Sequence, residues 1–147
     1  MQYDVIIIGA GPGGIFSAYE LSKLCPEKKI AVFEEGQPLE KRRCPIDGKN
    51  VRHCIGCPTC AIMNGFGGAG AFSDGKYNLT NDFGGTLYEY IGKKQAMELM
   101  HYVDEINVSH GGEHTKLYST ANSAFKTRCL QCNPVSYTHL TLPTIRL

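Results

Sequence analysis

The sequence contains no tryptophan and no apolar run approaching the roughly 20 residues that a membrane-spanning helix needs. Its charge is nearly balanced, with 15 Lys and Arg against 14 Asp and Glu, so no basic excess favours nucleic acid or an anionic membrane as partner. A signal peptide is not indicated either, because Asp4 precedes the first apolar run and no basic residue does. We therefore expect a soluble, cytoplasmic chain that binds neither nucleic acid nor membrane.

Acidic residues are also absent from the last part of the chain, since no Asp or Glu follows Glu113. Residues 134–147 show neither helical nor clean strand periodicity, and the string VSYTHLTLPTI within them resembles a translated sequencing-adapter read-through. We expect residues 132–147 to be a non-native tail, which would make the rest an N-terminal fragment of a longer protein. The alternative is a genuine C-terminal strand over residues 135–142.

The first 36 residues predict a strand, a helix and a second strand. Residues 3–8 and 30–33 are short apolar runs that are typical of buried parallel strands, and residues 15–24 have helical spacing before Pro26. Such a βαβ unit closes with a right-handed crossover. The sequence therefore predicts an α/β fold with a Rossmann-like unit and an incomplete parallel sheet.

The remainder of the chain divides into a long irregular segment and a helical one. Residues 37–85 are dominated by Gly, Pro, Asn, Asp and Cys, and a loop of this length inside a domain is usually functional or metal-bound. Helical spacing returns from residue 86, with helices expected over 87–91, 96–106 and 122–130. We expect residues 1–131 to form the N-terminal part of one nucleotide-binding domain.

A glycine-rich motif lies between the first predicted strand and helix. It satisfies the dinucleotide-binding pattern G-x-G-x-x-G with the residues Gly9, Gly11, Pro12, Gly13 and Gly14. The first glycine permits the tight turn, the second lets the backbone approach a pyrophosphate, and the third lets the helix pack closely on the strand. The helix N-terminus offers free N–H groups and a partial positive charge to the phosphates.

The second predicted strand ends at Glu34, 20 residues after Gly14, where its carboxylate can accept both hydroxyl protons of a ribose. A glutamate here argues against a 2′-phosphate and therefore against NADP. It does not separate FAD from NAD. A glycine-rich turn in a protein that binds no nucleotide is the remaining alternative.

Several segments resemble a bacterial family of FAD-dependent dehydrogenases among the glutathione-reductase-like flavoproteins. The similar strings are DVIIIGAGPGG, VFEEG, KRRCPI, GFGGAGAFSDGKYNLT and YVDEI. The resemblance covers residues 1 to about 131 and implies an oxidoreductase with FAD, whose ADP half lies on residues 9–14. It also implies that Glu34 binds the adenosine ribose and that Arg42 lies near the ribose or adenine.

A second glycine-rich loop spans residues 65–76, and its few side chains would let the backbone lie against a flat ring. In a flavoprotein this suits the isoalloxazine or the pyrophosphate. Lys76 could stabilise negative charge on the reduced flavin and Asp74 could hold Lys76. The candidate residues are Gly67, Gly68, Ala69, Gly70, Ser73, Asp74 and Lys76. A flexible surface loop or tight helix packing is the alternative.

Four cysteines fall within 17 residues, at positions Cys44, Cys54, Cys57 and Cys60. The C-x₂-C-x₂-C spacing suits an iron–sulfur cluster or zinc. A redox dithiol is a further option, and some of these thiols could have no role.

Together these patterns predict an FAD-dependent oxidoreductase, inactive as this fragment, with no catalytic residue named. An NAD-dependent Rossmann dehydrogenase and a non-catalytic Cys-rich metal-binding module are the alternatives. The substrate and electron acceptor are not indicated.

Overall fold

The computed structural model describes residues 2–73, 75–82, 84–119, 124, 128 and 144–146. The chain divides into two compact units, Met1–Asp74 and Gly75–Leu147, which are described separately below. The boundary between them falls within the segment predicted as a long loop. Within the described residues, no helix is both long and apolar enough to cross a membrane.

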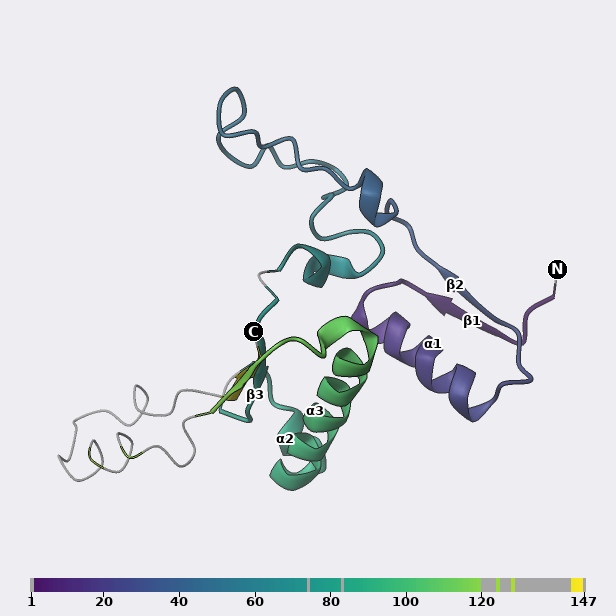
Figure 1. The fold of residues 1–147 in the computed structure, drawn as a ribbon. Coiled ribbons are helices and arrows are strands. Elements are labelled where there is room, and N and C mark those ends of the chain that lie inside the picture. Colours follow the sequence, from purple (N-terminus) through teal and green to yellow (C-terminus); the bar gives the residue numbers. More distant parts are fainter. Residues whose placement is uncertain are drawn as a thin grey trace. The chain divides into compact units, whose positions relative to one another are not determined.

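The first unit begins with the predicted strand–helix–strand order (Figure 1). Strand β1 (Val5–Ile8) and strand β2 (Ile30–Phe33) form a parallel two-stranded sheet, and helix α1 (Pro12–Leu24) connects them. The strands are tied at their start because the Lys29 N–H donates a hydrogen bond to the Asp4 carboxylate at 2.8 Å. Helix α1 begins three residues earlier than predicted, since Pro12 suits the first position of a helix.

Helix α1 packs on one face of this sheet, and the second face is open within the described residues. Ile7 is half-buried and approaches Gly14 of α1, whereas Ile6 and Ile8 on the other face are 57% and 81% exposed. The prediction of a buried strand over residues 3–8 is therefore wrong for this face of β1 within the described residues. A two-stranded sheet with one helix has a cover for one face only.

Residues 37–73 are mostly irregular, as predicted. They contain two short 3₁₀ helices, η1 (Leu39–Lys41) and η2 (Gly68–Phe72). Gly67 precedes η2 with φ +84°, a left-handed conformation that glycine adopts without strain.

The second unit is a helical pair with a small antiparallel sheet. Its elements are β3 (Tyr77–Leu79), α2 (Leu87–Ile91), α3 (Lys93–Asn107), the π-helical turn η3 (Val108–Gly112), β4 (Leu117–Tyr118) and β5 (Thr144–Arg146). The strand order is β3-β5-β4. The two helices confirm the predictions for residues 87–91 and 96–106. The prediction that residues 37–85 lack regular structure is wrong at β3.

The core of the second unit is small. Leu79, Ala96 and Ile106 are buried among the described residues, and Asp104 is buried with them. Burial raises the pKa of the Tyr77 hydroxyl, and the charge of Asp104 raises it further.

Two predicted segments lie largely outside the described residues. For the helix expected over 122–130, only residues 124 and 128 are described, and for the tail only Thr144–Arg146. Those three tail residues form the middle strand of the β3-β5-β4 sheet. Whether the tail is native stays a prediction.

Candidate functional site: a cavity at the glycine turn

The turn from β1 to α1 is held tightly to the end of β2. Gly9 has φ +95°, and its N–H donates a hydrogen bond to the Phe33 carbonyl at 2.7 Å. A Cβ at Gly14 would overlap the Gly9 carbonyl oxygen, so the backbones of strand and helix touch at this point. Glycine at position 14 is therefore required by packing alone.

Gly11 differs from Gly14 because its side-chain direction is open. A Cβ built at Gly11 meets no atom within 4 Å, and its extended backbone (φ −74°, ψ −177°) accepts any residue type. Neither packing nor backbone geometry within the chain explains a glycine here. The free space is what a pyrophosphate lying against the backbone would occupy.

Glu34 joins the end of β2 to the glycine turn. Its Oε2 accepts a hydrogen bond from the Ala10 N–H at 2.6 Å, and its Oε1 accepts one from the Gly36 N–H at 2.8 Å. The Ala10 bond is the main cause that holds the Glu34 pKa below its usual value, followed by the Gly36 bond. The Gly65 N–H lowers this pKa as well. A carboxylate has about four lone-pair sites, so three backbone donors leave about one for a further donor such as a ribose hydroxyl.

A cavity of about 280 Å³ opens beside this turn. It is lined by Ile8, Gly9, Gly11, Phe33, Glu34, Glu35, Met63, Asn64, Gly65 and Gly68, all of which belong to the first unit. The structure thus brings the glycine turn, the acidic end of β2 and the second glycine loop to one cavity.

The second glycine loop packs directly on the first. The Gly67 N–H donates to the Ala10 carbonyl at 2.8 Å. Gly68 is buried, and a Cβ there would lie 3.3 Å from Pro12 Cδ, closer than ordinary contact. This close approach explains why the loop needs residues without side chains at this point.

Of the predicted loop residues that the structure describes, Gly68 lines this cavity and Gly67, Ala69, Gly70, Ser73 and Lys76 do not. Ala69, Gly70 and Ser73 are exposed. Asp74 lies outside the described residues, and Lys76 belongs to the second unit. The predicted roles of Asp74 and Lys76 toward a flavin therefore stay predictions.

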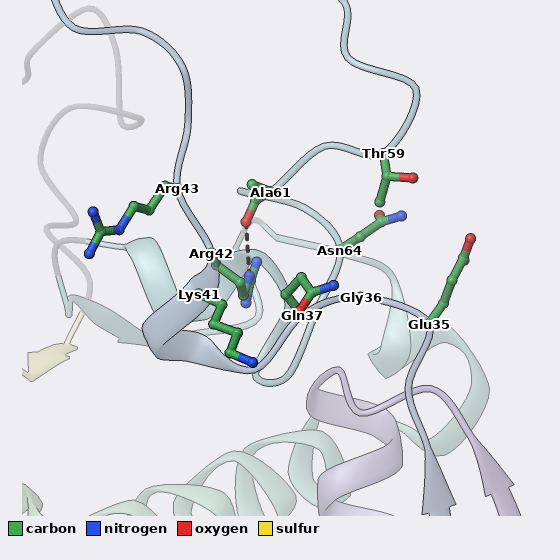
Figure 2. Close-up of a pocket in the computed structure, with 9 residues that line it drawn as sticks. All are labelled: Glu35, Gly36, Gln37, Lys41, Arg42, Arg43, Thr59, Ala61 and Asn64. Atoms are coloured by element: carbon green, nitrogen blue, oxygen red, sulfur yellow. Dashed lines mark hydrogen bonds between the residues drawn. The ribbon is translucent and has the colours of Figure 1, made fainter.

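Arg42 is buried and lines a second cavity, of about 320 Å³ (Figure 2). Its guanidinium donates hydrogen bonds to backbone carbonyls, including that of Ala61, whereas the neighbouring Arg43 side chain is exposed. The resemblance implies that Arg42 lies near the ribose or adenine, but Arg42 does not line the cavity at the glycine turn. The two cavities share Glu35 and Asn64.

Some residues of the cavity wall, such as Met63 and Asn64, could not be predicted from the sequence. Met63 and Asn64 carry no motif that distinguishes them from other loop residues, and only their adjacency to the glycine run could have indicated them. The sequence did not indicate Gly36 either, which lines the second cavity and not the one at the glycine turn. A Cβ at Gly36 would overlap the backbone of Gly65, so Gly36 allows the second loop to reach the end of β2.

The cysteines are not gathered into a metal site within the described residues, where no three Cys, His, Asp or Glu side chains are close enough to hold an ion. Cys44 and Cys54 are exposed, and Cys57 and Cys60 are half-buried. All four are free thiols. Their assignment as metal ligands stays a prediction.

Comparison with known proteins gives two short similarities. The chain is 43% identical over 42 residues to "Uncharacterized protein R188" of Acanthamoeba polyphaga mimivirus, covering 29% of this chain and 8% of that protein. It is 37% identical over 73 residues to an uncharacterized protein of Clostridium beijerinckii, covering 48% of this chain and 13% of that protein. The matched segments are thus small parts of much longer relatives. No family model and no solved structure matches the chain.

Proposed function

We propose that residues 1–74 bind the ADP half of FAD and that the whole protein is an FAD-dependent oxidoreductase. One observation carries the proposal: the open glycine turn, the Glu34 carboxylate and the second glycine loop line a single cavity. Bound FAD would supply the acceptor for a pair of electrons, and the protein would bind and orient it.

The residues fit an adenosine diphosphate group. The backbone at Gly11 is open to a pyrophosphate, and α1 places its N-terminus at the same turn. The Glu34 carboxylate retains an acceptor position for a ribose hydroxyl, and its lowered pKa keeps it ionised at neutral pH. The negative charge of Glu34 disfavours a nucleotide with a 2′-phosphate.

FAD is preferred over NAD because of the second glycine loop. The ADP half of either cofactor needs only the turn and Glu34, whereas here a glycine-rich segment also packs on the turn through Gly67 and Gly68. Its exposed glycine and alanine backbone offers a surface for a flat ring. An NAD-dependent dehydrogenase has no need for this loop.

Titration of the chain with ADP, followed by amide NMR, tests the proposal. We expect ADP to shift the amide resonances of residues 9–14 and 34–36. Gly11→Val should abolish binding, because the new side chain fills the space for the pyrophosphate. Glu34→Ala should weaken it roughly ten- to a hundredfold, the usual effect of losing a charged hydrogen-bond acceptor.

Ser17→Val is the matched control, since it adds a β-branched side chain to the exposed side of the same helix. It should bind ADP as the unaltered chain does. Adenosine 2′,5′-bisphosphate should bind more weakly than ADP, and FAD should shift additional amides in residues 65–72 that NAD does not. Equal ADP affinity for the unaltered chain and Gly11→Val would refute the proposal.

A further inference from the structure

We infer that Arg42 is a positioning residue that holds the second glycine loop in place as a wall of the nucleotide cavity. The inference rests on the proposed function for the identity of the ligand. It differs from what the family resemblance implies, because Arg42 would act through the loop and not by contact with the nucleotide.

Arg42 is almost completely buried, with 4% of its surface exposed. Its guanidinium donates four hydrogen bonds, all to backbone carbonyls. Nε donates to Ala61 at 2.8 Å, Nη1 to Phe66 at 2.8 Å and to Gly68 at 3.0 Å, and Nη2 to Ile62 at 2.6 Å. The guanidinium also lies over the Phe72 ring, 4.8 Å from its centre.

These acceptors come from both ends of one loop. Residues 61 and 62 precede its turn, and residues 66 and 68 follow it, so the loop wraps around a single planar cation. At Gly65, between them, φ is +127°, and a Cβ would lie 2.6 Å from Arg42 Cδ. Only a residue without a side chain lets the backbone pass this close to the arginine.

The loop that Arg42 holds is the one that lines the cavity. Part of the cavity wall is formed by Met63, Asn64, Gly65 and Gly68. The Gly67 N–H donates a hydrogen bond to the Ala10 carbonyl of the glycine turn. Without Arg42, four carbonyls would lose a charged donor. A wall that is already ordered adds no ordering cost when the ligand binds, which strengthens binding.

A lysine at position 42 could not make the same four hydrogen bonds. An ammonium group is compact and has three donors at one point, whereas the guanidinium has five donors spread over a rigid plane. Four carbonyls held around a plane therefore require arginine for its shape as well as for its charge.

Amide exchange and ADP titration of Arg42→Ala and Arg42→Lys test this role, with Arg43→Ala as the matched control. Arg43 is adjacent and exposed and does not line the cavity at the glycine turn, and its replacement removes the same charge. In the absence of ligand, both Arg42 variants should lose exchange protection at the Gly67 and Gly68 amides, and ADP should bind roughly tenfold more weakly or worse. Arg43→Ala should change neither by more than about twofold.

Rescue separates positioning from a general loss of stability. Millimolar guanidinium ion should restore part of the ADP affinity of Arg42→Ala and part of the Gly67 protection, whereas ammonium ion should not. If Arg42→Ala does not fold, as judged by loss of the Gly9–Phe33 hydrogen bond, Arg42→Lys decides the matter because it keeps the alkyl stem and the charge.

Three results would overturn the inference. These are ADP affinity and Gly67 protection unchanged in Arg42→Ala, full ADP affinity in Arg42→Lys, or weaker ADP binding with unchanged loop protection, which would mean direct contact with the ligand. Failure of the unaltered chain to bind ADP would refute the proposed function instead. The exchange measurements on the unliganded variants would still show whether Arg42 holds the loop.

Discussion

Glu34 occupies a position where a single carboxylate serves both the protein and its proposed ligand. Its two oxygens already accept the N–H groups of Ala10 and Gly36, which fixes the end of β2 against the glycine turn. Protonation of the carboxylate would weaken these bonds, because the two N–H groups would lose a charged acceptor. The protonation state of Glu34 therefore affects how firmly the turn is held.

Acidification should loosen the turn. The backbone donors lower the Glu34 pKa in the folded chain, so the folded chain binds this proton less readily than the unfolded chain does. The stabilisation is therefore fully present above the unfolded pKa of about 4.3 and is lost as the pH falls through the lower folded pKa. An NMR titration of the Ala10 amide should show a midpoint below about 4.3, the usual glutamate value.

Glu34→Gln provides the control for this titration, because it retains an acceptor oxygen but no ionisable group in this range. The Ala10 transition should disappear in that variant. A midpoint at or above the usual glutamate value in the unaltered chain would contradict the hydrogen-bonded geometry of Glu34.

At the scale of elements, the packing of α1 on β1 depends on Gly14 and not on the adjacent Gly13. We expect Gly14→Ala to destabilise the chain by about 1–3 kcal/mol, because its Cβ would overlap the Gly9 carbonyl oxygen and the backbones must separate. Gly13→Ala should be neutral or stabilise by up to about 1 kcal/mol, since its Cβ meets no atom within 4 Å and alanine favours the helix.

Urea unfolding of the two variants measures this difference at adjacent positions. Equal unfolding midpoints, or a lower midpoint for Gly13→Ala than for Gly14→Ala, would contradict the close contact of strand and helix at Gly14.

The elements that the sequence predicts well are those with a strong local pattern. The βαβ order, Gly14 at the contact of strand and helix, and α2 and α3 follow from apolar spacing and glycine placement. Strand β3 was missed because it is three residues long and its partner β5 lies more than 60 residues away in the sequence. Pairing between distant segments leaves little trace in a short window.

The site was predictable in part for the same reason. Gly11 and Glu34 belong to a motif whose spacing is fixed by the βαβ unit. Met63 and Asn64 reach the cavity because a loop folds around Arg42, and no local rule relates an arginine to carbonyls about 20 residues later. Likewise, the apolar run in β1 indicates a strand but not which face is covered.

At the scale of the whole molecule, the proposed site lies entirely within the first unit. Every residue that lines the cavity at the glycine turn precedes residue 75, as do Arg42 and its four acceptors. The predicted non-native tail, residues 132–147, belongs to the other unit, where its described residues form β5. Removal of the tail therefore tests two assignments: that the site belongs to the first unit, and that residues 132–147 are non-native.

We expect a chain ending at residue 131 to bind ADP with the affinity of the full 147-residue chain, because no lining residue is removed. Strand β5 pairs with both β3 and β4, so the truncation should instead speed amide exchange at residues 77–79 and 117–118. Exchange at residues 5–8 and 30–33 serves as the internal control and should not change, since those strands pair with each other. A several-fold loss of ADP affinity on truncation would contradict the placement of the site in the first unit alone. Unchanged exchange at residues 77–79 would show that β5 does not protect these amides in solution, which is expected if the tail is non-native.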